Sequence, residues 1–310
     1  MVVQSRALAR AGSMVRRLPI ADGGAVTHNR TARGETILGI PDERLRGWLL
    51  RWGLEPDGEP VATPSSLLLP VLAVGAPAML KVALIAEEAR GGRQLVWWSG
   101  RGAARVLAIE GDAVLMERAA GGSLAPLAQG GRDGEATSII CRLAAQLHRP
   151  VPRSGPDLVP LETWFEPLLQ ASAGGEDFAL AATLAKRLLA AREPEVSLHG
   201  DLHHHNVLDF GGGDWRAIDP KGLRGERTFD FVHLLRNPDP VTVGTPGRLE
   251  ARVAQIASEG GIGPVRLLAW ALAFSALSAI WSTQDGDCPT ADLALLQRCR
   301  ALLSLSEPLE

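Results

Sequence analysis

The chain has 310 residues, which is long enough for one large domain or for two lobes around a sizeable core. Its formal net charge of −3 argues against the dense basic surface that binds nucleic acid, so we expect no nucleic-acid partner. Its three cysteines form no Cys-x-x-Cys pair, which indicates neither a disulfide framework nor a thiolate zinc site. A cytoplasmic location fits this cysteine content.

Residues 1–40 are rich in Gly, Arg, Thr and Ala and have no hydrophobic periodicity, which predicts a poorly structured N-terminal extension. Apolar residues in this segment never form the continuous block of a secretory signal peptide. Four arginines precede the first acid, Asp22, so a presequence over residues 1–21 stays open as an alternative.

Residues 41–118 are predicted to form a small lobe that mixes helices and strands. A helix is expected from Pro41, because a proline and acids precede an apolar face at helical spacing. Pro70 places the first strand at a sheet edge, since proline cannot donate a ladder hydrogen bond. The other predicted elements are strands at 67–74 and 78–83, a charged helix at 85–95, and a hairpin of 106–109 with 113–116.

Residues 119–310 are predicted to form a larger, mostly helical lobe after a linker of small residues. Apolar residues recur at helical spacing from Ile139 to Leu147 and from Leu180 to Leu188, which predicts two helices. Further helices are expected at 246–258, 264–281 and 290–304. The apolar run 265–281 contains Arg266 and is too short to span a bilayer, so we predict a buried core helix and no membrane partner. The predicted fold class is therefore α+β, with a sheet-containing N-lobe and a helical C-lobe.

The segment LHGDLHHHNVLDFGGGDWRAIDPKG, residues 198–222, carries the densest set of polar side chains. NVLDF and WRAID flank the turn GGGD, which predicts a β-hairpin. If 211–214 form the loop, Asn206 and Asp219 are directly opposed, with Cβ atoms about 4.5 to 5.5 Å apart. An amide oxygen and a carboxylate on one face suit a Mg²⁺ ion that keeps its waters and binds phosphate oxygens. A register shift of one residue would remove this argument.

Asp201 is the candidate catalytic base. His199, Asp201 and Asn206 have the spacing H-x-D-x-x-x-x-N of a kinase catalytic loop, in which the aspartate orients and deprotonates the attacking hydroxyl. An unperturbed aspartate has a pKa of about 3.9, so this carboxylate is ionised and able to accept a proton at neutral pH. The alternative is a loop aspartate that caps local amides.

The sequence resembles the aminoglycoside phosphotransferase family, in the branch of streptomycin 6-phosphotransferases and hydroxyurea-resistance kinases. The resemblance covers residues 45 to 305 and rests on HGDLHHHN, IDPKGLRGERTFD, LKVAL, LVWWSGRGAARVL and VLMERAAGGSL, which are specific in combination. It implies a protein-kinase-like fold, ATP and Mg²⁺ as cofactors, and phosphoryl transfer to a hydroxyl of an aminoglycoside-like small molecule. We expect a monomer or a homodimer.

The resemblance implies a role for each matching residue. Asp201 would be the base, Asn206 and Asp219 the Mg²⁺ ligands, and Asp230 a brace for the catalytic loop. Lys81 would contact the α- and β-phosphates and pair with Glu88, or with Glu87 if the helix is rotated. Met116, Glu117 and Ala119 would lie in the hinge that holds the adenine, and Lys221 has a weaker match near the γ-phosphate.

Lys81 also stands out without the resemblance. It lies between Leu80 and Val82 in a strand that otherwise has no charge, and a buried ammonium needs partners such as a phosphate and a carboxylate. The alternative is an edge-strand lysine whose ammonium reaches solvent. No G-x-G-x-x-G motif precedes it, so Ser65 and Ser66 are the candidates for covering the phosphates.

Two other functions stay open at this point. A metal-dependent hydrolase would use His199, Asp201, His203 and Asp219, although His203, His204 and His205 are consecutive and point in different directions. A nucleotide-binding relative without turnover would explain the missing glycine-rich loop. The acceptor is not defined by the sequence: its candidate contacts are acids of the large lobe and two tryptophans, namely Asp157, Glu162, Trp164, Glu166, Glu176, Asp177, Trp281, Asp285 and Asp287.

Overall fold

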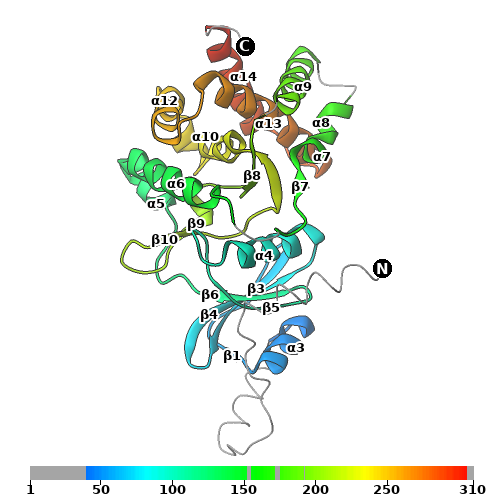
Figure 1. Ribbon diagram of the computed structural model, residues 1–310, viewed down its shortest axis with the longest axis vertical. Coiled ribbons are helices and arrows are strands. Elements are labelled where there is room, and N and C mark those ends of the chain that lie inside the picture. The colour runs from blue at the N-terminus through cyan, green and yellow to red at the C-terminus, as the bar shows by residue number, and fades with distance from the viewer. Residues whose placement is uncertain (1–39, 152–154, 172–174, 192, 306–310) are drawn as a thin grey trace, which may run out of the picture. The chain divides into compact units, whose positions relative to one another are not determined.

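The computed structural model describes residues 40–151, 155–171, 175–191 and 193–305. The chain divides into two compact units, Met1–Ala120 with Arg153–Pro156, and Gly121–Pro152 with Asp157–Glu310. Figure 1 shows a sheet in the first unit and mainly helices in the second. The expected N-terminal extension and presequence lie outside the described residues, apart from Ile40.

The first unit contains an antiparallel sheet in the strand order β1-β3-β4-β6-β5, and β2 also pairs with β3. Strands and helices lie within one or two residues of most predicted bounds, although the helix at 86–98 continues three residues beyond its predicted end. The elements are α3 (Glu43–Trp52), β1 (Glu55–Pro56), β2 (Val61–Ala62), β3 (Ser66–Ala73), β4 (Ala76–Ala83), α4 (Ala86–Trp98), β5 (Val106–Glu110) and β6 (Ala113–Glu117).

The two faces of this sheet have different roles. Asp42 caps α3 by accepting hydrogen bonds from the N–H groups of Arg44 and Leu45, and the buried face of α3 joins one apolar core with alternate residues of β3, β4 and β6. Leu80 lies in that core. Because successive strand residues point to opposite faces, Lys81 lies on the other face, against which α4 packs.

The prediction that Pro70 marks an edge strand is wrong. β3 has strands on both sides, with β4 along one side and the short β1 and β2 along the other. Pro70 falls between the residues of β3 that pair with β1 and those that pair with β2, and its carbonyl accepts a hydrogen bond of 2.8 Å from the N–H of Asp57. The proline is tolerated because the neighbouring ladder is interrupted where an N–H is missing.

Gly92 allows α4 to approach the sheet closely. A Cβ atom at this position would lie 2.6 Å from Cγ2 of Val114, the residue of β6 that pairs with Lys81.

We expect Gly92→Ala to lower the free energy of unfolding by about 1–2 kcal/mol, because overpacking outweighs the gain in helix propensity. Gly47→Ala in α3, where nothing lies within 4 Å of the new Cβ, should instead stabilise by up to about 1 kcal/mol. Denaturant titration measures both, and stabilisation by both variants would contradict the packing argument.

The second unit is built around the helix α13 (Pro264–Gln284). Thirteen consecutive residues of α13, Leu267–Ala279, are buried, and the helix contacts α8, α9, α10, α12 and α14. α13 is long and apolar enough to cross a membrane by length and composition. However, 72% of its apolar 18-residue stretch is buried inside the protein, as expected for a core helix. The other helices are α5 (Ala125–Leu127), α6 (Asp133–Leu147), α7 (Leu161–Trp164), α8 (Glu166–Gln170), α9 (Gly175–Ala190), α10 (Val232–Arg236), α11 (Pro240–Val243), α12 (Arg248–Gly260) and α14 (Thr290–Ser304), with shorter turns η1 (Ala128–Arg132), η2 (His204–Asn206) and η3 (Arg227–Phe231).

Two small sheets in this unit hold the polar segment. β9 (Val207–Asp209) and β10 (Trp215–Ala217) form the predicted hairpin. The second sheet has the order β7-β11-β8 and was not predicted. Its strands are β7 (Val159–Pro160), β8 (Glu195–Leu198) and β11 (Leu223–Glu226).

Candidate functional site

The loop that follows β8 is held by Asp230. This fully buried carboxylate accepts hydrogen bonds from the N–H groups of His199 at 2.9 Å and Gly200 at 2.7 Å, and it contacts Nε2 of His148 at 2.7 Å. Burial alone would raise the pKa of Asp230, but His148, the charge of His199 and the Gly200 N–H outweigh it and lower that pKa. Gly200 has a φ of +79°, and a Cβ there would meet Leu223 at 2.8 Å. The expected bracing contacts of Asp230 are therefore present.

Asp201 has hydrogen-bond donors on both carboxylate oxygens. Its Oδ1 lies 3.1 Å from Nδ1 of His233 and 3.4 Å from Nε2 of His203, and Nδ2 of Asn206 donates to its Oδ2 at 3.1 Å and to its backbone carbonyl at 2.9 Å. Burial would raise the pKa of Asp201, but the contacts with the two histidines hold it well below the usual value. The side chain is 26% exposed. Asp201 is thus an oriented, ionised carboxylate with access to solvent. The contact with His233 was not predicted from the sequence.

The three consecutive histidines point to three different partners, as expected. His203 contacts Asp201, His204 lies 3.5 Å from Asp133, and His205 contacts the carbonyl of Pro238 at 3.0 Å. Nε2 of His199 lies 2.8 Å from the carbonyl oxygen of Ile218. No group of three or more His, Cys, Asp or Glu side chains among the described residues is arranged to hold a metal ion. The arrangement therefore does not support a zinc hydrolase built on this cluster.

The predicted register of the hairpin is wrong by one residue. Arg216 pairs with Leu208 and Ala217 with Val207, so Asn206 is not opposite Asp219. The loop between the paired residues Asp209 and Trp215 has five residues, 210–214, one more than expected. The side chain of Asp209 accepts hydrogen bonds from the N–H groups of Gly211 and Gly213 and so stabilises this loop. The argument for a Mg²⁺ site from directly opposed side chains is therefore lost.

Asn206 and Asp219 still lie at the same end of the hairpin. The carbonyl of Asn206 accepts a hydrogen bond of 2.9 Å from the N–H of Ile218, the residue before Asp219. Since Nδ2 of Asn206 donates to Asp201, its Oδ1 is the atom with which the amide can bind a cation. Asp219 has a φ of +63°, and its Oδ2 lies 3.9 Å from Nζ of Lys221. These oxygen donors fit Mg²⁺, which needs only one or two protein ligands besides water and phosphate.

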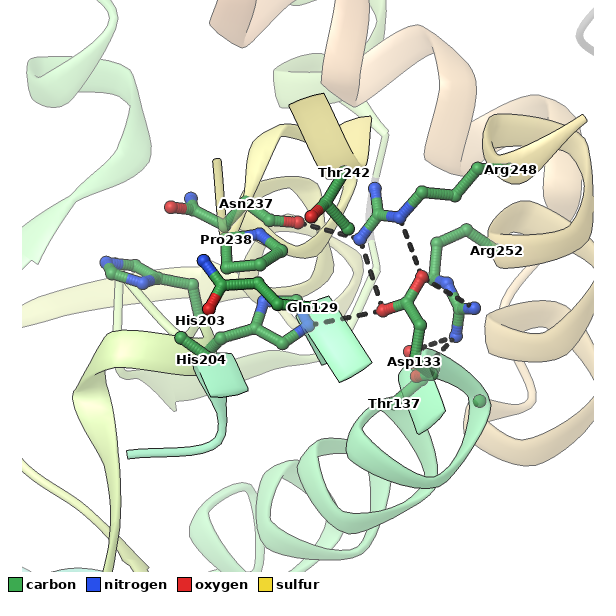
Figure 2. A network of polar contacts seen from close by, with 12 residues as sticks. Gln129, Asp133, Thr137, His203, His204, Asn237, Pro238, Thr242, Arg248 and Arg252 are labelled. Atoms are coloured by element: carbon green, nitrogen blue, oxygen red, sulfur yellow. Dashed lines mark hydrogen bonds and ion pairs between the residues drawn. The ribbon is translucent and has the colours of Figure 1, made fainter. Parts of the chain in front are cut away.

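A buried network of polar contacts holds the turn η2 through His204 (Figure 2). Nε of Arg248 lies 2.7 Å and Nη2 of Arg252 lies 3.0 Å from Oδ2 of Asp133, at the start of α6, and His204 lies against Oδ1. Burial would raise the pKa of Asp133, but His204 and the two arginines outweigh it and lower that pKa strongly. Arg248 also donates to the carbonyl of Asn237 at 2.7 Å. This network was not predicted from the sequence, because its members are far apart in the chain.

In the first unit, Lys81 pairs with Glu88. The Lys81 ammonium and the Glu88 carboxylate form an ion pair in which both side chains are largely buried, and the hydroxyl of Ser65 donates to Oε1 of Glu88 at 3.0 Å. Glu88 is therefore an ion-pair partner of Lys81 in this structure. Ser66 is buried, and its hydroxyl contacts Oγ1 of Thr63 at 3.1 Å. Ser65 orients Glu88, while the hydroxyl of Ser66 closes the turn before β3.

The expected hinge residues lie at the end of β6. Met116 is buried and pairs with Met79, and Glu117 is the last residue of the strand. The N–H of Glu117 donates to the carbonyl of Arg105 at 3.0 Å, and its side chain accepts from the N–H of Arg105 at 2.6 Å. Ala119 lies in the irregular segment after the strand. Met116 and Glu117 are therefore held in the sheet, whereas Ala119 is not.

The two candidate acceptor tryptophans pack against each other. Trp164 and Trp281 meet edge to face, with ring centroids 5.2 Å apart, and Trp281 also contacts Phe274. Glu166 lines a cavity of about 500 Å³ together with Thr163, Pro167, Gln170, Ala171, Ile280 and Gln284. One of the predicted acids thus lines a cavity of the second unit, and the two tryptophans are not among its lining residues.

Comparisons with known proteins agree with these features. The family described as aminoglycoside/hydroxyurea antibiotic resistance kinase matches residues 51–286. A streptomycin 3''-kinase from Klebsiella pneumoniae is 50% identical over 265 residues, which are 82% of this chain and 99% of that protein. A streptomycin 6-kinase from Streptomyces glaucescens is 32% identical over 256 residues, which are 76% of this chain and 81% of that protein.

Solved structures show the same fold. A ternary complex of a thermostable mutant of the aminoglycoside phosphotransferase APH(4)-Ia with AMP-PNP and hygromycin B has a TM-score of 0.60 at 14% identity, covering 86% of this chain and all of that chain. The expected α+β, protein-kinase-like fold is confirmed, as is the resemblance found in the sequence. The chain belongs to the aminoglycoside/hydroxyurea antibiotic resistance kinase family and is an ATP-dependent phosphotransferase that acts on an alcohol group.

Proposed function

We propose that this protein inactivates streptomycin or a related aminoglycoside by transferring the γ-phosphoryl group of ATP to one of its hydroxyls. The observation that carries the proposal is the ionised, partly exposed carboxylate of Asp201, held by His233, His203 and Asn206. Relatives named streptomycin kinases support the acceptor class. A cytoplasmic location and a monomeric or dimeric state stay predictions.

The residues of the second unit supply the chemistry at the acceptor. The acceptor oxygen would form a bond to the γ-phosphorus while the bond from that phosphorus to the bridging oxygen of ADP breaks. Asp201 would take the hydroxyl proton, which then passes to solvent. Asn206 and Asp219 would hold Mg²⁺, which when bound neutralises the charge on the phosphate oxygens.

Lys81 and Glu88 of the first unit would bind the nucleotide. The ammonium of Lys81 would contact the α- and β-phosphates, and Glu88 would fix its position through the ion pair. Ser65 would contribute by orienting Glu88, and backbone groups of Met116, Glu117 and Ala119 would hold the adenine. The hydroxyl of Ser66 is bonded to Thr63, so only its backbone is proposed to lie near the phosphates.

The functional test is ATP consumption by the purified protein with Mg²⁺ in the presence of streptomycin, other aminoglycosides or hydroxyurea. Stimulation by streptomycin is the expected result, and nuclear magnetic resonance of the product then identifies the hydroxyl that carries phosphate. The position matters because one relative is named a 3''-kinase and another a 6-kinase. ATP binding without stimulation by any acceptor would overturn the proposal and favour a nucleotide-binding relative without turnover.

We expect Glu88→Gln to lower kcat/KM for ATP by about 10- to 100-fold, because the amide cannot balance the charge of Lys81. The amide oxygen can still accept from Ser65, so the fold should be kept. Glu87→Gln is the matched control on the same helix turn and should change this ratio by less than about threefold. Steady-state kinetics with varied ATP measure both, and the reverse ranking would show that Glu87 is the functional partner.

A further inference from the structure

His233 has no assigned role, yet its contact with the carboxylate of Asp201 is as short as that of Asn206. It lies in α10, 5% exposed, with Nδ1 at 3.1 Å from Oδ1 of Asp201. The imidazole is enclosed by Phe229, with ring centroids 5.8 Å apart and planes at 89°, and by Phe274, with centroids 4.5 Å apart and planes at 56°. The ring is therefore held in one orientation by aromatic packing, with a single polar contact toward Asp201.

The contacts also assign the proton of this imidazole. Asp201 is ionised and only accepts hydrogen bonds, so Nδ1 of His233 must carry the hydrogen that lies between them. Nε2 of His233 is buried and has no hydrogen-bond partner among the described residues. A proton on Nε2 would be a buried donor without an acceptor, which is costly, so the neutral Nδ1–H tautomer is the one that the surroundings favour.

Oδ2 is the oxygen of Asp201 that has a lone pair left to accept a hydrogen bond from an acceptor hydroxyl. Nδ1 of His203 accepts from the N–H of His205 at 3.2 Å. Nε2 of His203 lies 3.2 Å from Nδ2 of Asn206, but both hydrogens of that amide are directed at Asp201, so the proton of a neutral His203 is on Nε2 and faces Oδ1. Oδ1 thus has two imidazole N–H groups directed at it, while Oδ2 has one, from Asn206. Each carboxylate oxygen has two lone pairs, so one lone pair of Oδ2 is left.

We propose that His233 is a positioning residue that fixes the carboxylate plane of Asp201 and directs Oδ2 toward the hydroxyl to be phosphorylated. The inference rests on the proposed function, because it assigns the proton to one atom of the proposed base. Without the Nδ1–H bond the carboxylate can rotate about its χ2 angle, and the reactive geometry is populated less often. The binding of ATP and acceptor does not depend on that rotation, so the loss should appear in kcat.

The test compares three replacements of His233 that differ in where they place an N–H group. In His233→Asn the amide nitrogen takes the place of Nδ1, in His233→Gln it lies nearer to Nε2, and His233→Leu has none. We expect His233→Leu and His233→Gln to lower kcat by about 10- to 100-fold, with both KM values changed less than about threefold. His233→Asn should recover most of kcat. Equal kcat in the Asn and Leu variants would overturn the proposal and leave only a packing role.

A second measurement on the unchanged protein keeps the inference testable even if the variants do not fold. Nitrogen chemical shifts of ¹⁵N-histidine-labelled protein report which ring nitrogen carries the proton. The expected result for His233 is the Nδ1–H tautomer in the wild type, and an Nε2–H tautomer would overturn the proposal. Absence of streptomycin turnover in the wild type would instead contradict the proposed function, so the two failures are distinguishable.

Discussion

Asp201→Asn is expected to lower kcat for the phosphorylation of streptomycin by about 10²- to 10⁴-fold while ATP still binds. The amide has nearly the same shape as the carboxylate, so the fold should be kept, although its NH₂ group can accept from neither His233 nor Asn206. It cannot take the hydroxyl proton, however, because it lacks the negative charge that those contacts stabilise in Asp201. The nucleotide contacts proposed for Lys81 lie in the other unit of the chain and should be unchanged.

Steady-state kinetics and a titration of ATP binding check this expectation. Asp209→Asn is the matched control in the same segment, since Asp209 accepts hydrogen bonds from the backbone of the hairpin loop and makes no described contact with Asp201. It should keep kcat within about a factor of three. Turnover that is unchanged in Asp201→Asn would remove Asp201 as the base and with it the mechanism.

Asp133→Asn is expected to lower the free energy of unfolding by about 3–5 kcal/mol at pH 7. The change removes the only carboxylate described in contact with the buried guanidinium of Arg248 and leaves Arg252 without its main charge partner. Two buried positive charges then lie close together without compensation. Denaturant titration measures the loss, and Glu135→Gln is the matched control. Glu135 pairs with Arg132 on the exposed side of the same helix, so its replacement should cost at most about 1 kcal/mol.

The pH dependence of this loss provides a second check. The folded state lowers the pKa of Asp133, so the stability that its ionisation contributes is fully present above the unfolded-state pKa of about 3.9 and declines as the pH falls toward the folded-state pKa. The difference between wild type and Asp133→Asn should therefore be constant from pH 7 to 5 and should narrow below pH 4. A difference that is independent of pH down to pH 3 would show that the charge of Asp133 is not its source.

The first unit could be predicted almost completely from its sequence. Apolar runs separated by the turns GAP and EGD indicate β3, β4 and β6, and Lys81 stands out as the charged residue of its run. That Lys81 lies on the face opposite the core was seen only in the structure. The prediction for Pro70 was wrong because it assumed that any strand beside β3 would form an uninterrupted ladder of hydrogen bonds with it. The sequence alone does not show that two strands of two residues each leave a gap there.

In the second unit the three long helices near the C-terminus, α12, α13 and α14, lie within about three residues of their predicted bounds. The site was predicted where its residues are closely spaced in the chain. Asp201 and Asn206 were found because they lie in one short loop with a kinase-like spacing, whereas Asp230 was found only through the family resemblance. The strands β7, β8 and β11 were missed, since each has only two to four residues and offers too little alternation to detect. The Asp133 network and His233 were missed for a different reason. Their partners come from distant segments, and an isolated Asp or His has no local pattern that reveals its contacts.

The backbone conformation at Asp219 lowers the stability of the fold, while the side chain provides a carboxylate for the proposed Mg²⁺ site. A residue other than glycine at a φ of +63° is held in the left-handed region at a cost of about 1 kcal/mol or more, and glycine would remove that cost. The proposed metal ligand is thus a side chain that the local backbone disfavours. Selection of variants for thermal stability alone should therefore enrich glycine at this position and yield sturdier proteins that no longer confer resistance. Selection on antibiotic should retain the strained aspartate.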